Sequence, residues 1–313
     1  MYKCKNAVAM IIFNRPENSD KVFGQVKNVK PPRLYIIADG ARDEQEWVKV
    51  KKSREIADKV DWDCEVCTIF AEKNLGCKKR IITGISEVFK REERAIILED
   101  DCVPTEEFFV FQDWALEKYE STEQIAVVSG SNLLDYQFTE KYKNGFSSYI
   151  NCWGWGTWKR VWNQYDEFLS IQEINKAYSE VVRNANLTAG QKKYWLHIFR
   201  NSVYSRTIWD FYLQYFFFKY SWCSVYPACN LVENIGFGND STHMKTEPEY
   251  IKRSMPEKEK IQAMFKLPEQ EFDREHLNRE RDKQVLVTLY GYSFFSRCKI
   301  YVGNILRFLG IRK

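Results

Sequence analysis

A chain of 313 residues with 44% hydrophobic and 29% charged residues has the composition of a globular protein, which excludes wholesale disorder and favours one large domain with an extension. The net charge of +4 suits an anionic small molecule or a membrane surface, and it is too small to favour nucleic acid as a partner. The nine cysteines are scattered and odd in number, so they do not suggest the disulfide framework of a small secreted protein and favour reduced thiols.

Five apolar runs of strand length recur in the first 130 residues, and segments with helical patterns lie between them. The runs cover residues 8–13, 34–38, 64–70, 95–98 and 125–129, and the helical segments cover residues 19–29, 44–60, 75–91 and 106–119. Strands that are apolar on both faces are typical of buried parallel sheets. The alternation therefore predicts a three-layer α/β/α fold with a mainly parallel central sheet.

The start of the chain and its hydropathy argue against membrane insertion. The first apolar run is short, and Arg15 and Pro16 follow it in place of a small-residue cleavage site, so we interpret it as a buried strand and not as a signal peptide. The sequence has no run of 18 apolar residues, so no membrane-spanning helix is expected.

Two lysines lie near the start of the third helical segment. Lys78 and Lys79 follow residues 74–76, and the backbone N–H groups at a helix start also favour anions. Together with Arg15 they are predicted to stabilise the charge that develops on a departing diphosphate. The alternative for both lysines is a solvated position on the helix surface.

The carboxyl end of the fourth run carries three successive acids, Glu99, Asp100 and Asp101. In α/β sheets, ligands bind beyond the carboxyl ends of the strands. Adjacent carboxylates repel one another and are costly to desolvate unless a cation or hydrogen-bond donors compensate for them. A hard divalent cation, bound by a carboxylate together with diphosphate oxygens and water, supplies this compensation, and a solvated turn before the helix at residue 106 is the alternative.

After residue 129, loops and aromatic clusters replace the regular alternation. Trp153, Trp155 and Trp158 alternate with glycines that allow a ligand to approach the chain. Because sugars pack their C–H edges on flat indole faces, these tryptophans are predicted to bind a sugar. The alternative is a structural plug that joins the two halves of the core.

The last part of the chain is charged and basic. Residues 245–282 are rich in charges and turns, and residues 285–313 mix apolar with basic side chains. We expect a charged connection followed by a basic amphipathic C-terminal extension, together residues 245–313. A helix of this kind either lies on anionic lipid or packs on the domain.

The buried strand with its Glu-Asp-Asp end, and the proline and two phenylalanines between residues 104 and 109, resemble the metal-binding motif of GT-A-fold glycosyltransferases. The chain is similar in particular to the N-acetylglucosaminyltransferase I family and to bacterial family 2-like and hemolysin-like sugar transferases. The similarity extends from residue 7 to about residue 243. It implies a GT-A-like catalytic domain over residues 1–244, with a nucleotide-binding half at residues 1–130 and an acceptor half at residues 131–244.

Carried over position by position, the resemblance implies roles for the acids. Asp101 corresponds to the direct metal ligand, and Glu99 and Asp100 correspond to residues that contact the ribose and the sugar of the donor. The metal of the family is usually manganese, with magnesium as the other candidate. His243 lies in a loop similar to a glycine-rich loop of the family, where it is either a metal or phosphate neighbour or an incidental histidine.

Three further positions match the family. Arg15 follows Asn14 where the family has an Asp-Arg pair, which implies contact with the nucleotide. Asp39 matches an aspartate that recognises the uracil edge, which implies a UDP donor. Asp210 corresponds to the base that takes the proton from the acceptor hydroxyl while the anomeric centre is inverted, and an Asp that caps or hydrogen-bonds within its helix is the alternative.

These features together predict a metal-dependent glycosyltransferase. It would move a hexose or N-acetylhexosamine from a nucleotide-sugar to a glycan or lipid-linked acceptor in surface polysaccharide synthesis, with the three tryptophans on the acceptor side. The protein is expected in the cytoplasm, with peripheral contact to the inner face of the membrane through its extension. The alternatives are a metal-dependent nucleotidyltransferase or phosphohydrolase and a non-catalytic sugar- or membrane-binding protein. The former often has an early glycine-rich phosphate loop, which residues 14–16 do not offer.

Overall fold

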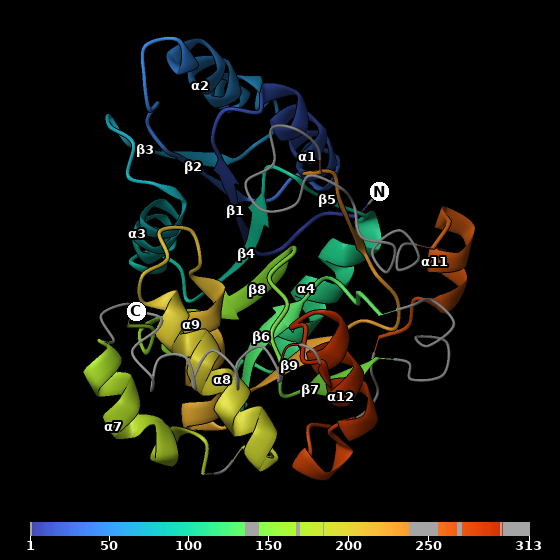
Figure 1. Cartoon of the computed structure of the whole chain (residues 1–313). Helices are drawn as coiled ribbons and strands as arrows, with labels where there is room; N and C mark the ends of the chain where they lie inside the picture. Colours follow the sequence, from blue (N-terminus) through green and yellow to red (C-terminus); the bar gives the residue numbers. More distant parts are fainter. Residues whose placement is uncertain are drawn as a thin grey trace.

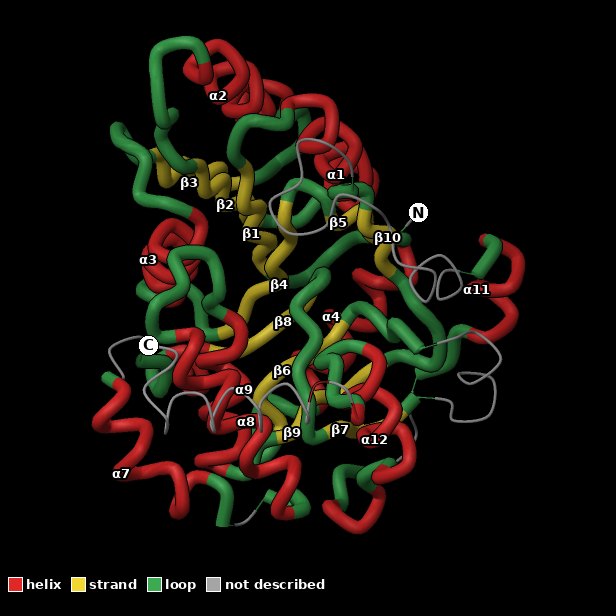
Figure 2. The backbone as a smooth tube through the Cα atoms, viewed as in Figure 1, coloured by secondary structure: helices red, strands yellow, loops and turns green. Residues whose placement is uncertain are grey.

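The computed structural model describes residues 2–134, 144–166, 170–183, 185–237, 256–267, 271–294 and 296. These residues form an α/β fold around an eight-stranded sheet, which confirms the predicted fold class. Figure 2 shows the sheet as one band in the order β3-β2-β1-β4-β8-β6-β9-β7. The strands in chain order are β1 (Ala7–Ile12), β2 (Arg33–Ala38), β3 (Glu65–Phe70), β4 (Arg94–Glu99), β6 (Ile125–Ser129), β7 (Gly145–Ser147), β8 (Trp155–Trp158) and β9 (Cys223–Tyr226).

The first four strands are parallel and match the predicted apolar runs within two residues at each end. Strands β1, β2 and β4 are apolar because both of their faces are covered, and every residue of β1 is buried. Strand β3 is the edge of the sheet, and all of its residues are exposed or half-buried. Burial on both faces therefore explains the continuous runs, and the weaker pattern of β3 reflects its single neighbour.

Strand β8 was not predicted and lies antiparallel between β4 and β6. Its residue Trp155 pairs with Ile97, and Gly156 pairs with Ile96. Strand β9 returns to the parallel direction beside β6, and β7 closes the sheet antiparallel to β9. The sheet is thus mainly parallel, with two antiparallel strands in its second half.

Helices cover both faces of the sheet (Figure 1). On one face α1 contacts both α2 and α4, and on the other α3 contacts α6, while α7, α8 and α9 pack against one another. The helices are α1 (Pro16–Val29), α2 (Glu46–Arg54), α3 (Cys77–Phe89), α4 (Glu106–Lys118), α6 (Lys159–Trp162), α7 (Ile171–Val181), α8 (Ala189–Ser202), α9 (Asp210–Tyr220), α11 (Lys258–Met264) and α12 (Arg279–Thr288), with short 3₁₀ turns η1 (Glu55–Lys59) and η2 (Arg274–His276). The predicted helix over residues 44–60 corresponds to α2 and η1.

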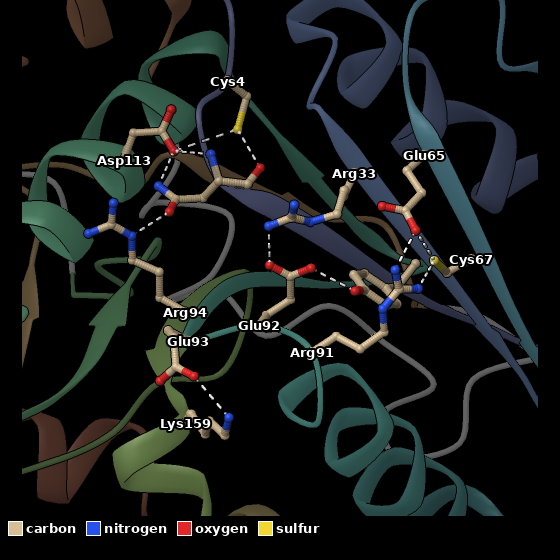
Figure 3. Close-up of polar contacts among 12 residues, drawn as sticks. Cys4, Arg33, Glu65, Cys67, Arg91, Glu92, Glu93, Arg94, Asp113 and Lys159 are labelled. Atoms are coloured by element: carbon tan, nitrogen blue, oxygen red, sulfur yellow. Dashed lines mark hydrogen bonds and ion pairs between the residues drawn. The ribbon is translucent and has the colours of Figure 1, made fainter.

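At the amino ends of the parallel strands, charged groups are paired with protein partners (Figure 3). Buried Glu92 pairs with Arg33 at 2.5 Å and accepts a hydrogen bond from the Tyr35 hydroxyl at 2.6 Å. Arg91 pairs with Glu65 at the start of β3. This edge of the sheet is therefore electrostatically satisfied by the chain itself.

The part of the chain after residue 244 joins the domain through α12. Val285 and Leu286 are buried in the core, and Val287 is exposed. Val285 and Leu286 therefore pack on the domain, which was one of the two alternatives for the predicted amphipathic segment 285–313. Most of that segment lies outside the described residues. None of the described helices is both long and apolar enough to cross a membrane.

Candidate active site

The three acids after β4 lie where the sequence places them, and Arg15 reaches them from the end of β1. Strand β4 ends at Glu99, and Asp100 and Asp101 form the turn into β5 (Cys102–Pro104). The Arg15 guanidinium pairs with Asp100 and, at 3.0 Å, with Asp101. One cation thus bridges two of the three carboxylates.

The backbone holds Arg15 in this position. Pro16 occupies the first turn of α1, where its missing N–H costs nothing. The Arg15 carbonyl accepts hydrogen bonds from the backbone N–H and the hydroxyl of Ser19, at 2.9 and 3.0 Å. The Phe13 N–H donates to Asp100 at 3.3 Å, which links the end of β1 directly to the acidic turn.

Glu99 is the acid with the least compensation. Its burial, and next the carboxylates of Asp101 and Asp100, raise the pKa of Glu99 above its ordinary value. Asp210 acts in the same direction, whereas Arg15 opposes the shift. A cation that entered between these acids would therefore gain much from the unbalanced negative charge.

A second strand pair fixes the other side of the acidic turn. Strand β5 pairs with β10 (Val232–Asn234), and the Ile235 N–H donates to the Asp101 carbonyl at 2.8 Å. Gly236 then lies directly against the Asp101 side chain, because a Cβ at this position would be 2.2 Å from Oδ2. The Asp101 carboxylate is thereby confined between Arg15 and Gly236.

These groups line a cavity of about 670 Å³, a size typical of small-molecule sites. Among the predicted site residues it brings together Arg15, Asp39, Trp153, Asp210 and the acids at 99–101. Cys77, Arg80 and Arg206 also line it, as do Leu289 and Tyr290 from beyond residue 244. The cavity wall therefore includes side chains from the segment expected to be an extension.

Asp39 lies on this wall, but its carboxylate is occupied by the chain itself. Oδ1 accepts from the N–H groups of Gly40 (2.9 Å) and Leu75 (2.8 Å), and Oδ2 accepts from the Gly76 N–H (2.9 Å) and the Asn74 amide (3.1 Å). Four donors use the four lone-pair sites of a carboxylate. In this structure Asp39 therefore holds the loop at residues 74–76 onto the end of β2, and the uracil-binding role that the resemblance implied stays a prediction.

Asp210 is the first residue of α9 and follows the buried Trp209. Trp209 stacks on Trp155 with ring centroids 5.6 Å apart, and its carbonyl accepts from the Tyr165 hydroxyl at 2.9 Å. Asp210 also contributes to the raised pKa of Cys77, which burial raises first, to about 12. Asp210 therefore lies on the cavity wall, near enough to Glu99 and Cys77 to raise the pKa of both.

The predicted sugar-binding role does not hold for two of the three tryptophans. Trp155 and Trp158 are strand residues of β8 with 1% and 2% of their surface exposed, whereas Trp153 lines the cavity. The intervening glycines serve packing, since a Cβ at Gly156 would be 2.4 Å from the Gln112 side chain and one at Gly154 would be 2.8 Å from Val232. Trp155 and Trp158 therefore belong to the core, which was the alternative to a sugar-binding role.

The structure also does not bring Lys78 or Lys79 to the cavity. The Lys78 ammonium lies 4.2 Å from the Tyr212 ring centroid, and Lys79 is exposed. Arg80 lines the cavity instead and is buried, with its Nε lacking a hydrogen-bond partner. Its sequence signal was a charged residue inside the apolar stripe of α3, which continues through Ile81 and Ile85.

Arg206 is a second cation that the sequence analysis missed. It is an exposed residue of the loop before α9, and its carbonyl accepts from the Lys78 N–H at 3.2 Å. No local pattern distinguishes it from other surface arginines. His243, the further predicted metal neighbour, lies outside the described residues.

No protein-family model matches this chain, and no curated protein matches it. Among solved structures it is similar to the inositol-1-phosphate CTP transferase from T. maritima, with 11% identity and a TM-score of 0.32 over 56% of this chain and 82% of that one. It is also similar to a UDP-glucose pyrophosphorylase complexed with UDP-glucose, with 9% identity and a TM-score of 0.22 over 48% of this chain and 64% of that one. At these scores the similarities carry no argument about activity.

Proposed function

We propose that the protein is a metal-dependent glycosyltransferase that moves a sugar from a nucleotide-sugar to an acceptor hydroxyl with inversion. The observation that carries this proposal is the composition of one cavity wall. The acids at residues 99–101 and Arg15 lie on the same cavity as Asp210, which comes from a different half of the chain. An anion-handling group and a separate carboxylate base are the two parts that such a transfer requires.

The residues present fit a divalent cation held by Asp101. The side chain of Asp101 is 18% exposed on the cavity, and carboxylate oxygen suits Mn²⁺ and Mg²⁺. Within the described part of the chain, no group of three His, Cys, Asp or Glu side chains is arranged to hold a metal alone. Diphosphate oxygens and water would complete the shell, and the bound cation would neutralise charge on the leaving diphosphate.

Asp210 would act as the base. The acceptor hydroxyl oxygen attacks the anomeric carbon and forms the new glycosidic bond, while the Asp210 carboxylate takes the hydroxyl proton. The bond from the anomeric carbon to the β-phosphate oxygen breaks, and the nucleoside diphosphate leaves with the electron pair. Arg15 would orient the donor, and it is free to do so only when its pairing with Asp101 is exchanged for a phosphate.

UDP is the proposed donor nucleotide because the resemblance of Asp39 to a uracil-binding aspartate implies it, and Arg80 lines the same cavity. Calorimetric titration of UDP and GDP, with and without Mn²⁺, tests the donor site in wild type and in Asp101→Ala. UDP binding that needs both Mn²⁺ and Asp101 is the expected result. Asp61→Asn, an exposed carboxylate paired with Lys27, is the matched control and should bind as wild type does. Absence of nucleotide binding under all conditions would refute the proposal.

One observation favours a second candidate, a nucleotidyltransferase. Arg15, Arg42, Arg80 and Arg206 all line the cavity, and such a set also suits a sugar phosphate that attacks an α-phosphorus. The two activities differ in their products. With a UDP-sugar and Mn²⁺, a glycosyltransferase transfers the sugar to an acceptor or to water and releases UDP. A nucleotidyltransferase forms UTP and the sugar phosphate, and only when pyrophosphate is added. UTP formation would replace the first proposal with the second.

A further inference from the structure

Aromatic side chains build a second part of the cavity wall, which adjoins the acidic turn. We call it the aromatic half of the cavity and define it by the lining residues Trp153, Phe211, Phe237 and Tyr290. Trp153 packs edge-on against Phe237 with ring centroids 6.2 Å apart, and Phe211 lies 5.9 Å from Tyr290. The Tyr290 hydroxyl donates to the carbonyl of Ile150, which precedes Trp153 by three residues in the chain.

Buried hydrogen bonds hold this wall in place. The Tyr290 hydroxyl lies 2.9 Å from the Ile150 carbonyl and 3.2 Å from the Gln214 amide oxygen. Gln214 is fully buried and is itself bonded to the Ile150 N–H and the Ser148 carbonyl. The hydroxyl is therefore committed to the protein. The Tyr290 ring packs against Tyr149 and Trp195, with ring centroids 5.5 and 4.9 Å away, and only the part that these rings leave uncovered lines the cavity. A wall fixed in advance loses little entropy when a ligand stacks on it.

The charged side chains on the cavity wall also bear on which ligand the aromatic half could take. Three of the four arginines among the described lining residues have carboxylates as partners or neighbours: Arg15 pairs with Asp100, Arg42 pairs with Glu46, and Arg80 is influenced by Asp39. The fourth, Arg206, is exposed and lies in the loop before α9. Among the described residues, the charged neighbour of Phe211 in the chain is Asp210, which also lines the cavity. A phosphate or uronate placed beside Asp210 would meet a like charge.

We infer that the aromatic half is the acceptor subsite and that it takes a neutral sugar, stacked on Phe211 and Tyr290 with a hydroxyl toward Asp210. The inference rests on the proposed function and names its acceptor class. It also gives the residues after α12 a part in substrate recognition, since Tyr290 comes from that segment.

Saturation-transfer NMR with simple glycosides tests this inference on the full chain, with UDP and Mn²⁺ present to fill the donor site. The probes are methyl β-glucoside, methyl β-galactoside and methyl N-acetyl-β-glucosaminide, with methyl β-glucuronide as the charged match. Binding of at least one neutral glycoside and none of the glucuronide is expected. Phe211→Ala should weaken that binding roughly 3- to 10-fold, the size of one aromatic contact, with the UDP affinity unchanged.

Two further variants guard against a trivial loss of folding. Phe211→Leu keeps an apolar side chain of similar size without the flat ring, so it should weaken glycoside binding while keeping the unfolding midpoint. Tyr204→Ala removes an aromatic ring that is 77% exposed and outside the cavity, and it should bind as wild type does.

The inference is overturned if the glucuronide binds as well as the neutral glycosides, if no glycoside binds while UDP does, or if both Phe211 variants bind like wild type. A protein that binds neither UDP nor glycosides would instead contradict the proposed function, so the two failures are distinguishable.

Discussion

Replacing Gly236 by alanine should weaken metal-dependent nucleotide binding without unfolding the protein. The new Cβ would lie 2.2 Å from the Oδ2 of Asp101 and 2.8 Å from its Cγ, whereas real Cβ contacts essentially never fall under 3.0 Å. The carboxylate must therefore move by roughly 1 Å, which exceeds the tolerance of about 0.2 Å in metal–ligand distances. Misplacement on this scale should weaken binding of UDP with Mn²⁺ roughly 10- to 100-fold.

The stability of this variant should change little, because the atom in the way is the end of a side chain that can rotate. The backbone of Gly236 is also outside the left-handed region, so alanine adds no strain there. Calorimetric titration gives the affinity and urea unfolding gives the stability. The matched control is Gly24→Ala in α1, where a Cβ meets nothing within 4 Å, and it should raise the free energy of unfolding by roughly 0.5–1 kcal/mol with unchanged binding. Wild-type affinity for UDP with Mn²⁺ in Gly236→Ala would refute Asp101 as the metal ligand.

Three other predictions concern the same site and its support. Arg15→Gln should lower the free energy of unfolding by roughly 2–4 kcal/mol, because it leaves buried Asp100 without its cation, and adding Asp100→Asn should recover part of the loss in a urea double-mutant cycle. Trp155→Ala should cost roughly 3–5 kcal/mol in urea unfolding, whereas Trp153→Ala on the cavity wall should cost less than about 1.5 kcal/mol, and equal losses would contradict their different placement. Because its pKa is raised to about 12, Cys77 should react with iodoacetamide at pH 8 roughly 100-fold more slowly than N-acetylcysteine, with a rate that still rises about tenfold per pH unit at pH 10, as peptide mapping would measure. A rate that levels off near pH 9 would mean that this thiol is not shielded.

The first half of the sheet was predictable because strands that are buried on both faces have continuous apolar sequences. Strands β1, β2 and β4 are continuous apolar runs, since each has a neighbour on both sides and helices above and below. Strand β8 has no such apolar run. Its glycines resemble loop signals, and its four residues become a strand only through pairing with β4 and β6, which lie far away in the chain.

The site residues also differ in whether their positions depend on the local sequence or on contacts with distant parts of the chain. Three adjacent acids at a strand end are anomalous in themselves, so the sequence alone pointed to them. The faces of α3 were harder to assign, because Lys79 and Arg80 are adjacent residues and only packing decides which one is buried. Tyr290 could not be predicted at all, since its place on the wall depends on a hydrogen bond to Ile150, 140 residues earlier.

The two ends of β4 differ in how far the protein itself compensates their charges, and this difference supports the acidic turn as the proposed site. At the amino end, Glu92 is buried yet has both Arg33 and the Tyr35 hydroxyl as partners, so its charge is compensated without a ligand (Figure 3). At the carboxyl end, one guanidinium faces two aspartates, and Glu99 lies beside them with a raised pKa. The same strand therefore begins with matched charges and ends with an excess of negative charge. An excess that folding does not compensate is costly to the free protein, and binding of a cation together with an anionic donor would recover that cost.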